Sequence, residues 1–309
     1  MLTRFHKIMI ALLAVQVALA VVMRTRADDA APLKEHPLLA GFDAATVTRI
    51  QIADKDGKPV DLAKRGDHWV IASGFDYPVP DSKISELLAP IAKLAAASPI
   101  TTSTTRHKQL GVADADFKKK LTLTAKGKDT TFFVGTPVGM RRSAFRFAND
   151  PKVYAVPSVW TSADPHDWMD AKYVDIPRDD IAKITVDKGG QVLTIDPADT
   201  TLDENKVSTI VGDVAEIEAL APGDPKRDAS HPLATITIER KSKDQASAAP
   251  VVLDVLADGD HDWVKQRGLD RAVVVVKNRL ADVLDATHDS IVKQTTATKT
   301  DTKPAKKSG

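Results

Sequence analysis

The chain has 309 residues, in which 43 lysines and arginines balance 42 aspartates and glutamates to leave a net charge of +1. No overall electrostatic field therefore favours nucleic acid, and the length is that of about two domains. Cysteine is absent, which excludes disulfides, thiolate nucleophiles, iron–sulfur clusters and cysteine-ligated zinc.

The N-terminus predicts a membrane anchor. A basic segment, residues 1–7, precedes a 16-residue apolar run, "IMIALLAVQVALAVVM", at residues 8–23. As a helix this run is about 24 Å long, so it spans the hydrocarbon core only if its flanks contribute, for example by snorkelling of Lys7 and Arg24. A cleaved signal peptide and a buried helix are the alternatives. Arg24 and Arg26 disfavour cleavage, so we expect an uncleaved single span with the body exported.

Two polar segments flank the body. Residues 24–37 contain proline and predict a tether. Residues 293–309, "KQTTATKTDTKPAKKSG", lack apolar periodicity and predict a disordered basic tail.

The same order of elements occurs twice between these segments. In residues 38–173, "TVTRIQI" alternates as a strand, an Asp-Gly turn and a hairpin follow, and a helix opens near Asp81 before further strands. In residues 174–292, "IAKITVDKGGQVLTI" supplies the strand and hairpin and a helix starts near Asp203. We expect two modules related as an internal repeat.

The repeat is clearest in the predicted helices, because residues 81–99 align without a gap to residues 204–222. The identical pairs are Lys83/Lys206, Ser85/Ser208, Ala92/Ala215, Ala96/Ala219 and Pro99/Pro222. The apolar pairs fall at helical spacing on one face: Ile84/Val207, Leu87/Ile210, Leu88/Val211, Ile91/Val214 and Leu94/Ile217. Chance similarity between two strand-rich segments is the alternative.

The helix ends are expected to be alike as well. Asp81 and Asp203, or the neighbour of Asp203, are placed as N-caps. Pro90 in the first helix, and Gly212 with Asp213 in the second, predict a bend or break after two turns. The expected fold is α+β: two related modules, each an antiparallel sheet covered by one helix, after an N-terminal transmembrane helix.

Three strings resemble a bacterial family: "HWVIASGFDYPVPDSKISELL", "GTPVGMRRSAFRFANDPKVYAV" and "HDWMDAKYVDIPRDDIAKITV". Together they are similar to domain of unknown function 4340 over about Phe42 to Ile195, and the similarity weakens through the second module. The resemblance implies a membrane anchor, an extracytoplasmic body and association with ABC-transporter systems of the gliding-motility type. It implies no reaction and no catalytic residues.

Motifs that could carry chemistry have structural explanations. "HDW" at His166 and at His261, and "DHW" at Asp67, resemble metal-binding clusters, but a turn entering a strand whose buried face begins at the tryptophan is favoured. We expect alanine at either histidine to lower stability modestly without abolishing function. "DKDGK" at Asp54 lacks the acids of a calcium loop, and "SIVK" at Ser290 lacks the partner motifs of an acyl enzyme.

Arg141, Arg142 and Arg146 are the candidate contact surface. The first two are expected at a turn and Arg146 on the next strand, where it alternates with Phe145 and Phe147. An anion or polysaccharide groove and an ordinary half-buried strand both fit this alternation.

These features predict a membrane-tethered extracytoplasmic accessory or interaction module of a transporter or cell-envelope complex, without catalysis. No catalytic residue, metal site or cofactor is expected, and nucleic acid is not an expected partner. The expected location is the bacterial inner membrane, single-pass, with the body in the periplasm and with ABC transporter permease or ATPase subunits as partners. The alternative is a lipid- or glycan-binding module that uses the cleft between the two modules.

Overall fold

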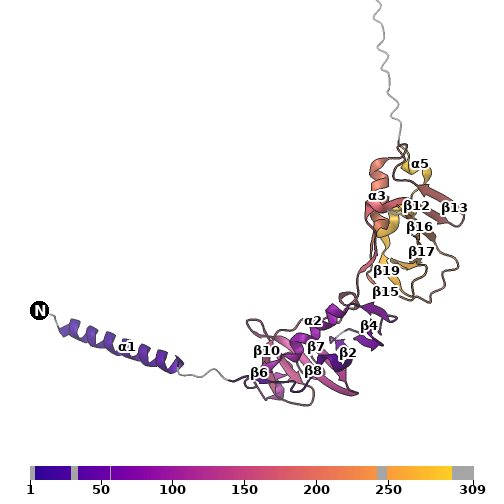
Figure 1. Cartoon of the computed structure of the whole chain (residues 1–309). Helices are drawn as coiled ribbons and strands as arrows, with labels where there is room; N and C mark the ends of the chain where they lie inside the picture. The colour runs from indigo at the N-terminus through magenta and orange to yellow at the C-terminus, as the bar shows by residue number, and fades with distance from the viewer. Residues whose placement is uncertain (1–3, 29–33, 56, 242–248, 294–309) are drawn as a thin grey trace, which may run out of the picture.

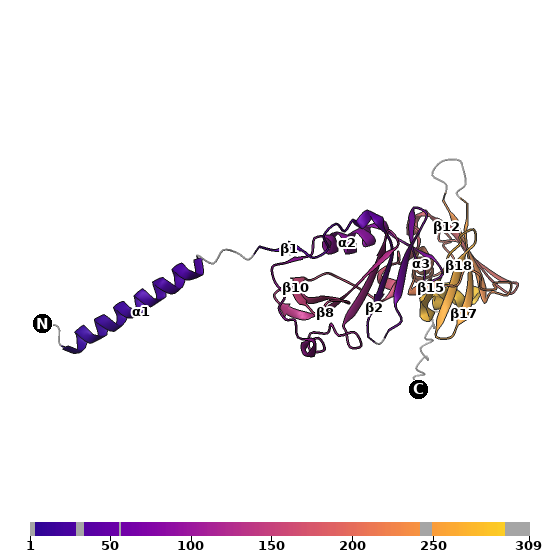
Figure 2. The same cartoon turned by 90° about the horizontal axis from the view of Figure 1, so that it is seen from below.

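The structure, a computed structural model, describes residues 4–28, 34–55, 57–241 and 249–293. Two antiparallel sheets follow one another along the chain, each accompanied by one 12-residue helix, and an N-terminal helix extends away from both (Figure 1, Figure 2). The chain is thus a mixed α and β protein with large antiparallel sheets and few helices, in agreement with the predicted α+β class.

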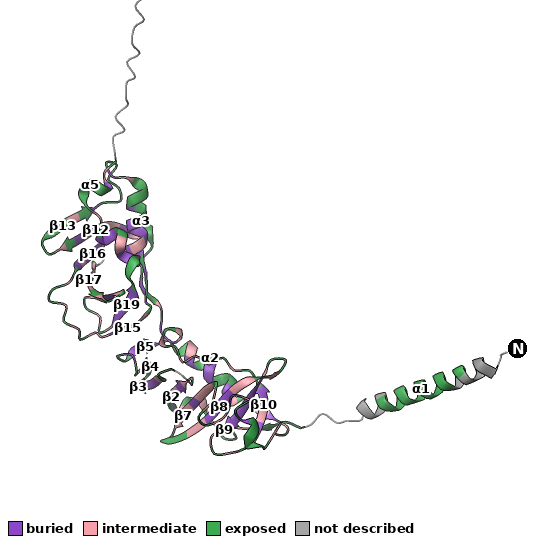
Figure 3. Ribbon diagram, turned by 180° about the vertical axis from the view of Figure 1, so that it is seen from behind, coloured by how far each residue is buried: buried purple, intermediate pink, exposed green. Residues whose placement is uncertain are grey.

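The N-terminal helix α1 (Arg4–Asp28) has 25 residues and contains the predicted anchor. Its described side chains are exposed, as the green helix in Figure 3 shows, and the large apolar ones are Met9, Leu12, Leu13, Val15, Val17, Leu19, Val21, Val22 and Met23. No helix among the described residues is long and apolar enough to cross a membrane. The predicted span stays a prediction.

The first sheet has eight strands in the order β10-β9-β8-β7-β2-β3-β4-β5. Its strands are β2 (Val47–Ala53), β3 (Val60–Arg65), β4 (His68–Ile71), β5 (Tyr77–Val79), β7 (Lys119–Ala125), β8 (Lys128–Gly139), β9 (Arg142–Phe147) and β10 (Val153–Pro157). Two short strands, β1 (His36–Pro37) and β6 (Ala95–Ala96), pair separately. The predicted Asp-Gly turn between β2 and β3 includes residue 56, which lies outside the described residues.

The second sheet has seven strands in the order β13-β12-β16-β17-β18-β19-β15. They are β12 (Ile181–Lys188), β13 (Gln191–Ile195), β15 (Ala221–Gly223), β16 (Ala234–Arg240), β17 (Val251–Asp258), β18 (His261–Gln266) and β19 (Ala272–Val276). A separate pair joins β11 (Lys172–Asp175) to β14 (Glu216–Glu218). Two short helices, α4 (Ala281–Leu284) and α5 (His288–Ile291), end the described chain. The module boundary placed between residues 173 and 174 falls inside β11.

The two sheets share a strand order. Six strands correspond one to one: β10-β9-β8-β7-β2-β3 in the first sheet match β19-β18-β17-β16-β12-β13 in the second. The first sheet continues beyond β3 with β4 and β5, and the second continues beyond β19 with β15. An irregularity also recurs, because the pairing register shifts between Val47 and Arg49 in β2 and between Ile181 and Lys183 in β12. Bulges are specific features of a strand, so the recurrence at the same place is informative.

The helices α2 (Asp81–Ala92) and α3 (Glu204–Ala215) start and end at positions that the ungapped alignment pairs. Each buries the apolar face predicted from its spacing: Ile84, Leu87, Leu88 and Ile91 in α2, and Val207, Ile210, Val211 and Val214 in α3. This face packs on the sheet of its own module, since the helical period places these residues on one side.

Two details of the helix ends differ from expectation. Asp81 is the first helical residue rather than the N-cap, because Pro80 takes the cap position without a side-chain hydrogen bond, whereas Asp203 caps α3 through the N–H groups of Asn205 and Lys206. Neither helix breaks after two turns. Pro90 and Gly212 lie in the last turn, so a kink or a weak helix former there affects only the two or three residues that follow before the helix ends.

The main hydrophobic core runs continuously through both sheets, and Trp168, Met169 and Tyr173 of the connecting segment are buried within it. A second, smaller core lies around Phe133 and Val153 in the first module. The two modules are therefore joined by packed side chains.

Candidate functional site

The three candidate arginines do not form a contact surface together. Arg141 is exposed at the turn between β8 and β9, with a φ of 55°. Arg142 pairs with Glu35 at 3.0 Å and donates to the carbonyl of Ala155 at 3.0 Å. Arg146 is 3% exposed, so the prediction that it belongs to a contact surface is wrong. Arg141 lies in the turn and Arg146 on β9, as predicted, whereas Arg142, predicted in the turn, is the first residue of β9.

Arg146 organises a loop instead. Its Nε donates to the carbonyl of Val112 at 2.7 Å, its Nη2 binds the carboxylate of Asp114 at 2.6 Å, and its guanidinium lies 4.7 Å from the ring centroid of Phe133. Its Nη1 donates to the carbonyls of Phe147, Ala148 and Asp150 at 3.1 to 3.3 Å. The side chain therefore ties residues 112–114 to the sheet that carries it.

A glycine lets the same loop approach β8 closely. A Cβ on Gly135 would lie 2.0 Å from the carbonyl oxygen of Leu110, and this oxygen accepts the N–H of Thr136 at 2.9 Å. No sequence motif signalled this contact, because the loop and the strand are 25 residues apart.

The first His-Asp-Trp motif lies at a 3₁₀ turn, and the second begins strand β18 directly after a turn. His166 is exposed in a 3₁₀ turn capped by Asp164, whose carboxylate accepts the N–H of His166 at 2.9 Å, and Trp168 is fully buried. His261 opens β18 after the turn at Gly259, and Trp263 is 1% exposed. Each motif turns the chain and then places its tryptophan in the interior, as the turn interpretation predicts.

The junction between the modules is occupied by aromatic and charged side chains. The guanidinium of Arg271 lies 5.7 Å from the ring centroid of Tyr77 and 5.8 Å from that of Tyr173. The hydroxyl of Tyr173 donates to the carbonyl of Arg271 at 2.9 Å and accepts the N–H of Gln266 at 2.8 Å. Burial raises the pKa of Tyr77 to about 12, so it stays protonated at physiological pH. These groups fix the junction.

The identical lysines of the helix alignment have the same structural task. The ammonium of Lys83 donates to the carbonyls of Asp167 and Met169, each at 2.8 Å, and that of Lys206 donates to the carbonyl of Ser290 at 2.5 Å. In the first module the helix thus holds the segment that follows β10, and in the second it holds the segment that follows the equivalent strand, β19. Their identity in the two copies is the sequence signal that pointed to a common role.

Equivalent hollows occur between helix and sheet in the two modules. The first, of about 350 Å³, is lined by Val47, Ile84, Ser85, Leu88 and neighbouring residues. The second, of about 540 Å³, is lined by the aligned Ile181, Val207, Ser208 and Val211 with their neighbours. Strand β4 contributes Trp69 to the first hollow only, whereas residues 196–200 and Leu202, which follow β13, line the second.

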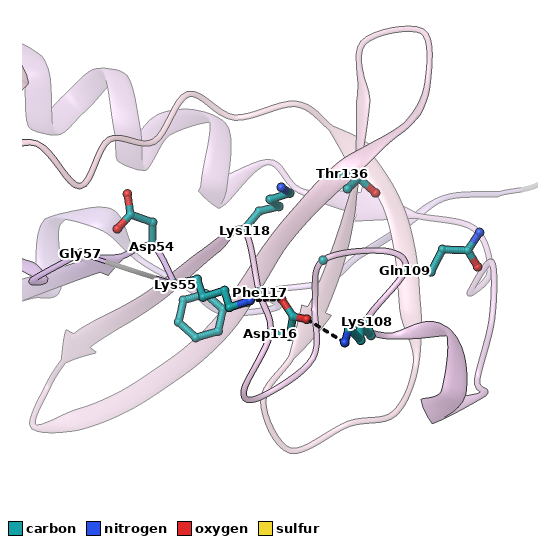
Figure 4. Close-up of a pocket in the computed structure, with 10 residues that line it drawn as sticks. Asp54, Lys55, Gly57, Lys108, Gln109, Asp116, Phe117, Lys118 and Thr136 are labelled. Atoms are coloured by element: carbon teal, nitrogen blue, oxygen red, sulfur yellow. Dashed lines mark ion pairs between the residues drawn. The ribbon is translucent and has the colours of Figure 1, made fainter.

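A larger hollow of about 860 Å³ lies on the first module and is polar (Figure 4). Its centre is Asp116, whose carboxylate is 3.2 Å from Nζ of Lys55 and 3.5 Å from Nζ of Lys108. The hydrogen bond from Lys55 and the charges of both lysines lower the pKa of Asp116. Among the lining residues, Lys55, Lys108 and Lys118 stand against Asp54 and Asp116, so this surface carries only one net positive charge.

Buried acids lie outside these hollows. Asp262 is 3% exposed in β18, and its burial raises the pKa of this carboxyl above the ordinary 3.8, while Lys277 and His261 oppose the shift. Burial likewise raises the pKa of Asp213 beside Arg279. Among the described residues, no group of three or more His, Cys, Asp or Glu side chains is placed to hold a metal ion.

Replacing Asp262 by asparagine is expected to flatten the pH dependence of stability. Because the folded-state pKa is raised, the charged carboxylate is disfavoured in the fold, so stability is greatest below the unfolded pKa near 3.8 and falls as pH rises through the folded value. Asp262→Asn removes this fall and stabilises the protein at pH 7. Urea unfolding at pH 4 and pH 7 measures the free energy of unfolding of this variant, and Asp260→Asn at an exposed position is the control. A pH dependence equal to that of the unchanged protein would contradict the prediction.

A family model described as "Domain of unknown function (DUF4340)" matches residues 69–235, more than half of the chain. The match begins in β4, includes α2, the junction and α3, and ends in β16. No curated protein and no solved structure matches the chain.

Proposed function

The chain belongs to the DUF4340 family, and from this premise we propose that it is a membrane-tethered, extracytoplasmic accessory or interaction module of a transporter or cell-envelope complex, with no catalysis of its own. The observation that supports the proposal most is what the polar side chains bind. Lys83 and Arg146 donate to backbone carbonyls, and the hydroxyl of Tyr173 bonds the backbone of Arg271 and Gln266 at the junction, which is the work of a scaffold.

The exposed apolar side chains of α1 support the tether. A helix that is apolar on all sides is stable in water only when something covers it, and a bilayer does so for a single helix that leaves the body. Because the apolar run at residues 8–23 precedes the body and the body is expected to be exported, we propose a single pass through the bacterial inner membrane. Residues 38–292 would then lie in the periplasm.

The shared strand order, the recurring bulge and the aligned helices support the proposal that the body arose as two related modules. Because the core is continuous across the junction, the modules would present their outer surfaces in a fixed relation. A rigid body of this kind suits contact with a permease or an ATPase-linked subunit, which the family resemblance makes the expected partners.

The alternative, a lipid or glycan ligand in a cleft between the modules, has less support. The three hollows described above are each lined by residues of one module, and aromatic side chains lie at the junction. No observation favours a ligand there.

Membrane attachment is tested by carbonate extraction of native membranes followed by intact-mass measurement. The proposal predicts that the chain stays in the membrane pellet and retains residues 8–23. A released chain that lacks this segment would contradict the tether.

A further inference from the structure

The two sheets differ at one edge. In the first, β3 pairs with β2 on one side and with β4 on the other, and β5 follows β4. In the second, the counterpart of β3 is β13, which pairs with β12 and ends the sheet. The chain between β13 and α3 is short, residues 196–203, and contains no strand. The second module therefore lacks the strands that cover this edge in the first.

The register identifies the backbone groups at this edge. Thr194 lies opposite Thr185, as Asp61 lies opposite the aligned Gln51. In the first module the carbonyl of Asp61 accepts the N–H of Ala72 at 2.7 Å, and its N–H donates to Oγ of Ser73 at 3.2 Å. The groups of Thr194 correspond to these bonded groups and face outward from the sheet.

The turn before β13 leads to the same assignment. Gly189 and Gly190 form a two-residue hairpin loop with φ of 60° and 96°, so Lys188 and Gln191 form the hydrogen-bonded pair that closes it. Hydrogen-bonded and non-bonded pairs alternate in antiparallel strands. Val192 and Thr194 therefore both present an N–H and a C=O to the outer edge.

The edge of β13 carries none of the usual protection. Edge strands are commonly blocked by lysine, proline or a bulge, whereas β13 reads "QVLTI" and pairs with β12 without a register shift. Val192 is 61% exposed on this strand. Such an edge is a template for an added strand.

The hollow lined by residues 196–200 and Leu202, which directly follow β13, indicates which side chain the added strand would carry. In the first module Trp69 of β4 is 6% exposed and lines the hollow between helix and sheet. The aligned hollow in the second module is larger, at about 540 Å³ against 350 Å³, and has no aromatic side chain among its lining residues. Its rim has four acids, Asp179, Asp196, Asp199 and Glu204, against Arg178, Lys241 and Lys293.

We propose that the outer edge of β13 docks an extended segment of a partner protein, which adds a strand to the sheet and places an aromatic side chain in the adjacent hollow. The excess of acids on the rim favours a segment with a basic residue near the aromatic one. The inference rests on the proposed function, since it names the surface by which the module holds its partner. A single extended segment needs only this edge and the hollow, whereas a stable dimer of the whole chain needs an interface of roughly 1,200 Å², which a five-residue edge alone does not supply.

The test uses the segment that covers the aligned edge in the first module. A fluorescent peptide of residues 66–73, "GDHWVIAS", carrying Asp67→Lys to supply the basic residue, is titrated into the detergent-purified full chain and followed by anisotropy and hydrogen exchange. We expect saturable binding, protection of residues 191–195, and binding at least about tenfold weaker when the tryptophan of the peptide is replaced by serine. Thr194→Pro, which removes the outward N–H, abolishes binding, whereas Thr194→Val, which keeps it, does not.

Three results would overturn the inference: no binding, protection of β3 rather than β13, or a dimer of the chain that Thr194→Pro dissociates. Thermal unfolding of both Thr194 variants shows that each is folded. If the chain binds the peptide but is not held in the membrane, the proposed membrane attachment is wrong and strand addition at β13 stands. If the chain is held in the membrane but does not bind the peptide, strand addition at β13 alone is wrong.

Discussion

Replacing Arg146 by methionine is expected to lower the free energy of unfolding by about 3 kcal/mol, the scale measured when one partner of a buried charged network is removed. Methionine fills much of the same space but donates no hydrogen bond. The carbonyls of Val112, Phe147 and Ala148 then lose their donor inside the protein, while Asp114, which is 75% exposed, is solvated by water.

The matched control is Arg141→Met in the adjoining turn. Arg141 is exposed, so its replacement is expected to change stability by less than about 0.5 kcal/mol. Urea unfolding of both variants measures the difference. Equal losses, or a larger loss for Arg141, would refute the structural role of Arg146 and restore the three arginines as equivalent surface residues.

The aligned helices provide the second large effect. Leu87→Ala in α2 and Ile210→Ala in α3 each remove a buried side chain from corresponding positions, at 0% and 3% exposure. Each is expected to cost about 2 to 5 kcal/mol, the usual range for truncation in a core. Because the core is continuous through the junction, we expect one cooperative transition in both variants, shifted to lower denaturant.

Glu86→Ala serves as control, since Glu86 is exposed beside Leu87 on the same helix and alanine has a high helix propensity. Its unfolding midpoint is expected to stay within the experimental spread of the unchanged protein. Two separate transitions in either core variant, seen by fluorescence and circular dichroism, would refute the continuous core.

The sequence predicted the helices well because their pattern is local. Four apolar residues at helical spacing are enough to define a buried face, and the matching bounds of α2 and α3 follow from it. The turns of the His-Asp-Trp motifs were predicted for the same reason, since the capping of His166 by Asp164 involves residues two apart.

Features that depend on distant segments were not predictable in this way. Arg146 alternates with phenylalanines as a half-buried strand residue does, and only the packing of residues 110–118 over β8 and β9 encloses it. The N-cap was predicted one residue too late, because the prediction looked for a capping side chain, whereas Pro80 holds the cap position with extended backbone and no side-chain bond. The open edge of β13 became visible only when the pairing registers of the two sheets were compared.

Purification of the full chain from native membranes in mild detergent, with crosslinking before extraction, tests the central claim most directly. The account predicts an intact chain in stoichiometric complex with an integral membrane protein or its ATPase subunit, with crosslinks from the body near β13. A chain recovered alone at its monomeric mass of 33.3 kDa, without any stoichiometric partner, would contradict it.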